Sequence, residues 1–522
     1  MMRFLAVTRN ILERSRRWES TFLSTMGITL MGTGMILLFP LMAALWFGDD
    51  ISVFLIPAVC CLCASVPLFV LFSAGRNMRA VDGILLIFAV WGVVMGIGSV
   101  PYILSGMGLI DGIFESVSGF TTTGSTVLHD DLWGMRSIIL WRSMTQWIGG
   151  IAIILVFISL FPMLGLGGRL MFENEMAGSG SRNFTAKMRD AALQFVMIYG
   201  LFSVVFFVAC VLMGTDPFDS VCLMFTTIST GGFLPYNDPS GLGAGIYSIP
   251  VQFLILVFMF LGGVNFYLHY QRIYRKRDAG YLRNHEFRSM IMLFAVASLI
   301  IFMISFGSVG DPNALVHAKD IIFMVVSSGT TTGFSVTGGI TAAGGWLTVP
   351  VIFGTIFLLC VIGGSSGSTS GGMKIGRAVT VLKFLSLDLK RRIYPRGVFD
   401  VKVNGETMDE RNTSVAYVIL FLFTGTIAAG FLGLMLLEPG LGFTDSLIMS
   451  LSSVTNTGFT GPYGPADGLA SLSGAAKAFL SLIMWIGRLE VATAVLIFMP
   501  YFWKEIFRGR RRIVRTDRDS SR

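Results

Sequence analysis

Long apolar stretches separated by short polar connections make up most of this chain. An α-helix needs about 20 apolar residues to cross a bilayer. Spans of that kind are predicted at 22–47, 51–75, 81–105, 137–162, 190–213, 246–270, 289–307, 347–380, 413–437 and 475–503, of which only 347–380 is clearly interrupted. Apolar runs of roughly ten residues, such as 113–120 and 321–326, are too short to span. The pattern therefore predicts an all-α polytopic membrane protein with ten spans and four half-depth hairpins.

Each half-depth run leads into a Ser/Thr/Gly segment that ends in Thr-Gly. The four copies are 118–124, 226–231, 327–333 and 452–458. An Asp lies 13 residues before the glycine in three copies and 12 before it in the second, and we expect this Asp to cap the half-helix. Further on, each copy is followed by a Gly pair or Gly-Arg, namely Gly149-Gly150, Gly262-Gly263, Gly363-Gly364 and Gly487-Arg488. This repetition predicts four units at 80–170, 171–285, 286–400 and 401–522, preceded by an accessory hairpin at 1–79.

The Thr-Gly copies have the chemistry of a cation filter. Non-helical backbone at membrane depth is tolerated where it is buried or lines a water-filled cavity. The C-terminal end of a half-helix carries a partial negative charge, and Ser/Thr/Gly backbone can turn its carbonyls toward an ion. A single copy would be more typical of tight helix packing, whereas four copies favour a pore. The predicted filter residues are Thr122, Thr123, Gly124, Ser229, Thr230, Gly231, Thr331, Thr332, Gly333, Asn456, Thr457 and Gly458.

Two departures from the repeat are candidate control elements. The first is the Gly/Ser run that begins Gly363-Gly364-Ser365 and ends Gly371-Gly372, which is predicted to be a flexible loop that obstructs the pore; the alternative is a kink needed for packing. Lys374 follows it, either as a gate contact or as an interfacial lysine. The second is Arg488, where the other copies have Gly, which is predicted to be an electrostatic barrier or else part of an ion pair with another helix. Glu490 does not share its helix face.

Composition and charge limit the class of protein further. The chain is 53% hydrophobic and 13% charged, whereas a soluble domain has roughly 25% charged residues. Lys and Arg gather in the connections between the four units and at both termini, so these are predicted to be cytoplasmic. The net charge of +8 follows from this bias and indicates membrane lipid, not nucleic acid, as the surroundings. No metal-ligand spacing, nucleophile–base pattern or phosphate-binding loop points to an enzyme. The alternative is a Na⁺- or H⁺-coupled secondary transporter with broken helices, which would predict inverted repeats.

These motifs resemble the Trk/Ktr/HKT superfamily, in particular its TrkH-type potassium uptake subunits. The resemblance covers nearly the whole chain and rests on the four Thr-Gly copies, the Gly/Ser loop and Gly487-Arg488. It implies four M1-P-M2 (potassium-channel-like) units around one pore, K⁺ as the transported ion, filter glycines at 124, 231, 333 and 458, and a gating loop at 363–374. It also implies a homodimer in the bacterial inner membrane and a cytosolic nucleotide-binding regulatory subunit of the RCK type, similar to TrkA. In this superfamily Ser at the first filter glycine accompanies sodium permeation, so Gly124 favours potassium. Whether transport is channel flow or symport stays open.

Overall fold

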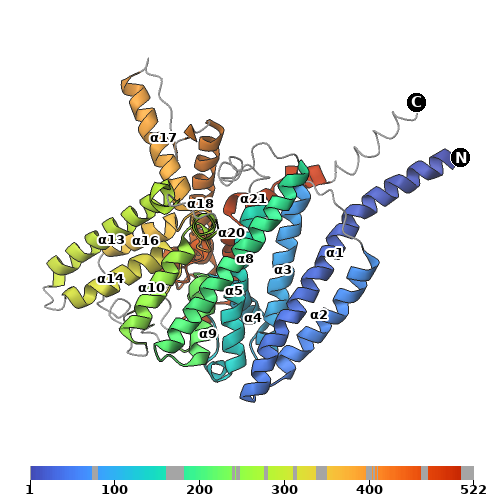
Figure 1. Cartoon of the computed structure of the whole chain (residues 1–522), viewed down its shortest axis with the longest axis horizontal. Coiled ribbons are helices and arrows are strands. Elements are labelled where there is room, and N and C mark those ends of the chain that lie inside the picture. Colours follow the sequence, from blue (N-terminus) through green and yellow to red (C-terminus); the bar gives the residue numbers. More distant parts are fainter. Residues whose placement is uncertain are drawn as a thin grey trace. The chain divides into compact units, whose positions relative to one another are not determined.

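The fold is helical over nearly all of the chain that can be described. The computed structural model describes residues 2–72, 80–159, 181–237, 242, 247–274, 280–309, 314–336, 350–394, 402–403, 406–407, 410–459 and 468–506. The chain divides into two compact units, one formed by 1–113, 134–138 and 492–522, the other by 114–133 and 139–491 (Figure 1). The four Thr-Gly copies all lie in the second unit.

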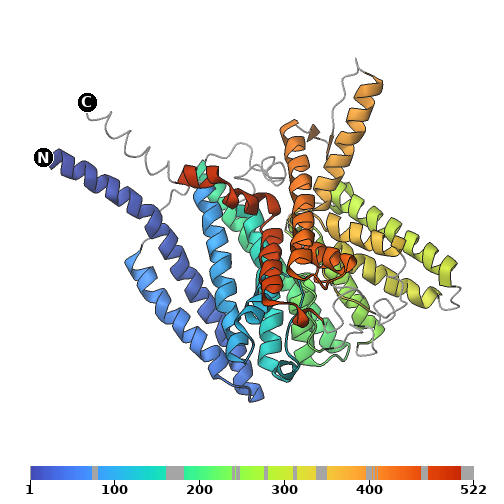
Figure 2. The ribbon, with the colours of Figure 1, turned by 180° about the vertical axis from the view of Figure 1, so that it is seen from behind.

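The first unit is built on three long helices. α1 (Met2–Phe47) and α2 (Ser52–Leu71) pack along each other, and α3 (Ala80–Leu104) contacts both (Figures 1 and 2). A short polar turn joins α1 to α2, and the Asp50 carboxylate there accepts a hydrogen bond from the backbone N–H of Ser52 at 2.9 Å. Large apolar side chains such as Met42 and Trp46 are exposed on this hairpin. That is the surface expected of helices that face lipid.

The second unit contains three groups of helices, and each group has the same three kinds of helix in the same order. Each group has a long helix, a short helix that ends at a Thr-Gly copy, and a further helix, and the three helices contact one another. The groups are α8 (Ser181–Leu212), α9 (Pro217–Ile228) and α10 (Ile249–Gly263); α13 (His285–Val309), α14 (Ala314–Gly329) and α16 (Pro350–Ile362); and α18 (Glu410–Leu437), α19 (Phe443–Thr455) and α20 (Gly474–Arg488). The first copy is flanked by α4 (Leu109–Phe120) and α5 (Arg136–Ser159). Helix α10 also contacts α14, and α16 contacts α19, so the last helix of one group touches the short helix of the next.

More helices are broken than the sequence suggested. Seven helices in the described part of the chain are long and apolar enough to cross a membrane, and two bent pairs raise this number to nine. The one predicted span that this number does not include, 347–380, consists of α16, the Gly/Ser loop and part of α17 (Ile375–Ile393). The expectation that only this helix is interrupted was wrong, because α10 is followed by α11 (Phe266–Ile273) at 98°, and α20 ends before α21 (Val491–Phe498) begins. At the first break the Asn265 side chain accepts from Tyr267 N at 2.9 Å, so it caps a new helix.

The remaining elements are small. They are the 3₁₀ turns η1 (Asp130–Gly134) and η5 (Leu469–Ser471), the short helix α12 (Gly280–Arg283), and the strands β1 (Lys402–Val403) and β2 (Glu406–Thr407). The two strands pair antiparallel, with Lys402 opposite Thr407. Apart from this minimal hairpin, the described chain agrees with the predicted helical class.

In each short helix the Asp that was expected to be the cap lies inside the helix instead. In α9 the capping residue is Asp216, whose carboxylate accepts from Phe218 N at 3.0 Å, while Asp219 lies within the first turn. Asp111 and Asp445 also lie in the first turn of their helices, and Asp320 lies well inside α14. A first-turn carboxylate still interacts favourably with the positive end of the helix dipole, so the pattern has a physical reason even though these residues are not caps.

Candidate functional site

All four short helices end in the same strained backbone motif. In the first copy, Thr123 N donates to Ser118 O at 2.9 Å and Thr122 N donates to Gly119 O at 2.9 Å, which is the bond pattern of a Schellman cap. The left-handed position of such a cap is usually Gly, yet here it is held by Thr122, Thr230, Thr331 and Asn456, with φ of 52°, 52°, 54° and 53°. A β-branched residue in this region costs on the order of 1–3 kcal/mol and persists where the surroundings enforce it. Repeated strain of this kind makes this region the candidate functional site.

Two residues after each strained position, a glycine completes a closed ring. Gly124, Gly232, Gly333 and Gly458 have φ between 72° and 87°. A Cβ added to any of them would lie under 3.0 Å from a carbonyl oxygen of another copy. The contacts run from Gly124 to Gly231 O, from Gly232 to Thr332 O, from Gly333 to Thr457 O, and from Gly458 to Thr123 O. The four copies therefore meet edge to edge, and the fourth closes onto the first; we call this arrangement the glycine ring.

The second copy corrects the predicted register by one residue. The counterpart of Gly124 is Gly232 and not Gly231, because Gly232 has the positive φ and the close carbonyl. The cap bonds agree, since Gly231 N donates to Thr226 O at 2.8 Å, as Thr123 N does to Ser118 O. With this register the Asp of the second copy also lies 13 residues before the glycine. Gly231 thus stands where the other copies have Thr, and Ser229 stands one place before the strained position.

Threonine hydroxyls stabilise three of the four copies in the same way. A hydroxyl–hydroxyl hydrogen bond joins the residue before the strained position to the residue after it. The pairs are Thr121 and Thr123 (2.8 Å), Thr330 and Thr332 (2.7 Å), and Thr455 and Thr457 (2.7 Å). The second copy has no partner hydroxyl at Gly231, and Ser229 donates instead to Phe225 O at 2.7 Å.

The Gly/Ser loop contacts three of the four copies. The hydrogen bonds join Gly371 N to Thr331 Oγ1 (2.6 Å), Gly372 N to Thr455 O (3.1 Å), and Thr230 Oγ1 to Thr369 Oγ1 (3.2 Å). Its first residues Gly363, Gly364 and Ser365 are buried, and Ser365 N donates to Gly263 O at 3.0 Å. The loop is therefore packed against the strained caps, which favours an ordered segment over the flexible one that the composition suggested.

Arg488 is buried against the loop and has no carboxylate partner among the described residues. Its guanidinium donates to Thr369 O at 2.8 Å and to Gly149 O at 3.2 Å, while Nε has no hydrogen-bond partner in the described part of the chain. An ion pair with another helix, the alternative considered from the sequence, is not formed by the described residues. A buried guanidinium that is bonded only to carbonyls keeps its positive charge uncompensated next to the loop.

The ends of the loop are held by charged side chains from two other segments. The Lys374 ammonium is buried and donates to Ser370 O within the loop, so it is a loop contact and not an interfacial lysine. Arg377, in the first turn of α17, pairs with Glu490 at the break after α20. The Glu286 carboxylate of α13 accepts from Ser366 N at 3.1 Å. Glu490 therefore engages Arg377 and leaves Arg488 alone, as its position in the sequence predicted.

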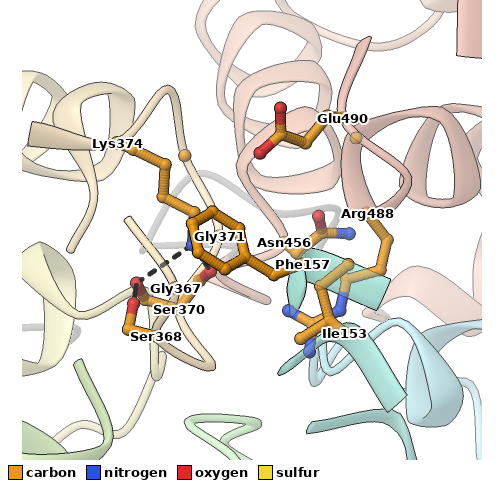
Figure 3. A pocket seen from close by; sticks show the side chains of 12 residues that line it. Ile153, Phe157, Gly367, Ser368, Ser370, Gly371, Lys374, Asn456, Arg488 and Glu490 are labelled. Atoms are coloured by element: carbon orange, nitrogen blue, oxygen red, sulfur yellow. Dashed lines mark hydrogen bonds between the residues drawn. The ribbon is translucent and has the colours of Figure 1, made fainter. Parts of the chain in front are cut away.

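A small cavity of about 20 Å³ lies between the loop and Arg488. Figure 3 shows Lys374 reaching back to the loop on one side, Arg488 on the other, and the Glu490 carboxylate directed away from the guanidinium. Asn456 also lines the cavity, and its amide donates to Thr123 Oγ1 at 3.0 Å. A cavity of this volume holds about one water-sized particle. The loop and Arg488 therefore leave little free volume beside the fourth copy.

Sequence reasoning missed three buried polar residues behind the glycine ring. Glu115 and Arg142 form an ion pair of 2.6 Å, and both are almost fully buried. Gln146, one turn after Arg142 on α5, is also buried and contacts the second copy. The signal was available, because Arg142 and Gln146 are polar residues four apart within a predicted span, which places them on one helix face.

Comparison with known proteins identifies the family. A family model described as TrkH, cation transport protein, matches residues 51–505. The Trk system potassium uptake protein TrkH of Escherichia coli K12 is 31% identical over 440 residues, which covers 82% of this chain and 87% of that protein. TrkI of Halomonas elongata is 31% identical over 517 residues, covering 96% and 100%. The crystal structure of the potassium transporter TrkH from Vibrio parahaemolyticus aligns with a TM-score of 0.82 at 26% identity, covering 93% of this chain and 99% of that one.

Three findings agree with one another: the helical architecture, the match to the family model over most of the chain, and the relatives that align over their full length. The chain is a multi-pass membrane transport protein and not an enzyme. It belongs to the TrkH family of cation transport proteins.

Proposed function

We propose that this protein conducts K⁺ inward across a bacterial cell membrane through a filter built on the glycine ring. The carrying observation is the closure of the ring, in which each copy places a carbonyl oxygen against the glycine of its neighbour. Four carbonyls held by strained backbone can replace part of the hydration shell of a cation. The short helices direct the negative ends of their dipoles toward the same region. The names of the relatives, which are potassium uptake proteins, support K⁺ as the ion.

In this proposal the filter residues are those predicted from the sequence, with the second copy moved to Thr230, Gly231 and Gly232. The described helices support a division of the chain into an accessory hairpin followed by four M1-P-M2 units. The positions of Lys and Arg support cytoplasmic termini in the inner membrane. In the same proposal, the resemblance to TrkH-type potassium uptake subunits implies a homodimer that is regulated by an RCK-type, TrkA-like cytosolic subunit.

The gate, in the same proposal, is the Gly/Ser loop together with Lys374 and Arg488. The loop is bonded to Thr230, Thr331 and Thr455, so it would have to leave three copies for ions to pass. The uncompensated guanidinium of Arg488 adds a barrier to a cation below the ring. Because the loop ends are held by ionic contacts, a cytosolic partner could shift the loop by acting on α17.

The test is ion flux into proteoliposomes with a K⁺ gradient, measured for K⁺, Rb⁺, Na⁺ and Li⁺. The variant is Gly124→Ser, since a side chain at φ +87° is strained and would also press on the Gly231 carbonyl. Gly200→Ser is the matched control, because Gly200 lies within α8 with no atom near its missing Cβ. We expect K⁺ and Rb⁺ flux in the wild type and the control, and lost K⁺ preference in Gly124→Ser. Flux that needs a second solute and ignores Gly124 would instead support a coupled secondary transporter.

A further inference from the structure

The junction between the first two copies differs chemically from the other three. At this junction the ring threonine is replaced by Gly231, and the amide of Gln146 occupies the vacated space. A Cβ added to Gly231 would lie under 3.0 Å from three atoms of the Gln146 carboxamide. The glutamine belongs to α5, which precedes the second copy in sequence. A side chain of α5 therefore fills the space beside Gly231 in the second copy.

The Gln146 carboxamide holds the backbone on both sides of the ring glycine. Its Nε2 donates to Gly231 O at 2.7 Å, and its Oε1 accepts from Phe233 N at 3.1 Å. These two bonds bracket Gly232. Gly231 O is also one of the four ring carbonyls, since it lies against Gly124. In the part of the chain that is described, no side chain donates to the other three ring carbonyls.

A buried ion pair fixes the helix turn that presents Gln146. Arg142 donates to Leu234 O at 3.2 Å, and its guanidinium stacks on the Phe233 ring at 3.8 Å from the centroid. Its Nε pairs with Glu115, and the other carboxylate oxygen of Glu115 accepts from Val127 N at 2.9 Å. The segments that follow Gly124 and Gly232 are thereby linked through three side chains, which we call the junction clamp: Glu115, Arg142 and Gln146.

The other three junctions carry apolar or weakly polar residues at the corresponding positions. Aligned on the glycine that follows each copy, Gln146 corresponds to Met259, Cys360 and Met484, and Arg142 to Ile255, Ile356 and Leu480. Aligned on the ring glycine, Glu115 corresponds to Leu223, Met324 and Met449. The Cys360 side chain contacts Thr457, which is the ring threonine of the next copy, so the alignment matches the geometry. Only the first junction combines a missing threonine with a polar clamp.

We propose that Gln146 is a positioning residue that determines ion selectivity by holding the Gly231 carbonyl in the ring. This inference rests on the proposed function, because it assigns to one ring carbonyl a share in selecting the ion. Without the amide, Gly231 lacks a threonine side chain, and among the described residues its carbonyl loses its hydrogen-bond donor. A carbonyl that is free to move can approach a smaller ion, so the preference for K⁺ over Na⁺ falls.

The experiment measures the K⁺/Na⁺ flux ratio in proteoliposomes for four variants. Gln146→Met introduces the residue found at two other junctions, and Gln146→Glu keeps the size and removes the donor. Gly231→Thr restores the ring threonine but collides with Gln146. The double variant Gln146→Met/Gly231→Thr rebuilds the arrangement of the other junctions. The control is Gln252→Met, because Gln252 is a second buried glutamine, and its amide donates to Leu242 O and Tyr247 O and accepts from the Lys319 ammonium, none of which belongs to the ring.

We expect Gln146→Met and Gln146→Glu to lower the K⁺/Na⁺ ratio by about ten-fold, the order expected for leaving a buried polar partner unsatisfied. Gly231→Thr alone loses K⁺ flux, and the double variant recovers both flux and ratio. Gln252→Met stays within about two-fold of the wild type. An unchanged ratio in both Gln146 variants, or a folded double variant no better than either single variant, overturns the inference. Absence of K⁺ flux in the wild type would contradict the proposed function. That result differs from the outcomes that overturn only the role of Gln146, because in those the wild type still conducts K⁺.

Discussion

The buried pair between Glu115 and Arg142 gives a sharp prediction about stability. Removing one partner of a fully buried ion pair leaves an uncompensated charge and costs about 3–5 kcal/mol. Arg142→Leu should therefore be strongly destabilising, because the Glu115 carboxylate would keep only its bonds to Thr126 and Val127. The cation–π contacts of Arg142 with Phe233 and Trp133, at 3.8 Å and 4.8 Å, are lost as well. In contrast, Glu115→Met/Arg142→Leu installs the residues of the fourth copy and should recover most of the loss.

The assay is thermal unfolding of the detergent-solubilised protein, followed by tryptophan fluorescence and by the fraction that stays monodisperse. We expect Arg142→Leu to lower the Tm by roughly 3–5 °C, from the usual relation between free energy and Tm. The double variant should lie within about 2 °C of the wild type. A double variant as unstable as Arg142→Leu would show that the cost arises from lost packing and not from the stranded carboxylate, and it would refute the reasoning.

Three further predictions concern the ring, the loop and an exposed turn. Gly232→Ala should abolish K⁺ flux, because its new Cβ collides with the Thr332 backbone carbonyl at a position of positive φ. Gly231→Ala should only reduce the flux, because its new Cβ meets the Gln146 side chain, and flux assays on both variants check this difference. Glu490→Gln should raise K⁺ flux measured without a partner on the order of ten-fold, since its pairing with Arg377 holds the loop end, and unchanged flux would argue against a latch. The Ser473 hydroxyl, and with it the Ser473 backbone N–H, holds the pKa of the Glu438 carboxyl below its ordinary 4.5. The contribution of Glu438 to stability is therefore present above that pH and is lost as the pH falls through the lowered pKa, so melting curves of wild type and Glu438→Gln from pH 6 to pH 3 should converge at the acid end.

The features that were predicted well from the sequence are those that depend on the local amino-acid composition. Apolar length located the spans, repetition located the four Thr-Gly copies, and the Gly/Ser run located the loop. Helix periodicity predicted that Glu490 does not pair with Arg488; the structure separates them by the break after α20, where Glu490 pairs with Arg377. Each of these depends on residues that are close together in the chain, so no tertiary contact was needed to find them.

The features that sequence missed depend on contacts between distant segments. The bend after α10 is set by the Asn265 cap, which looks like any polar residue beside a glycine pair. The register of the second copy was misread because two glycines follow Thr230, and only the backbone φ and the neighbouring carbonyl distinguish Gly232 from Gly231. The junction clamp was missed for the same reason. The role of Gln146 depends on its contact with Gly231, 85 residues later, where the other copies have threonine.

The ring itself is specified by backbone geometry more than by side chains. All four copies keep the left-handed residue, the two cap bonds and the glycine two places on, although the left-handed residue is Thr in three copies and Asn in one. At about 1–3 kcal/mol each, four strained residues would relax unless buried hydrogen bonds held them. Those bonds come from threonine pairs in three copies and from Gln146 in the other. It follows that one substitution made at equivalent positions should have different effects in different copies, and that the largest differences should separate the second copy from the rest.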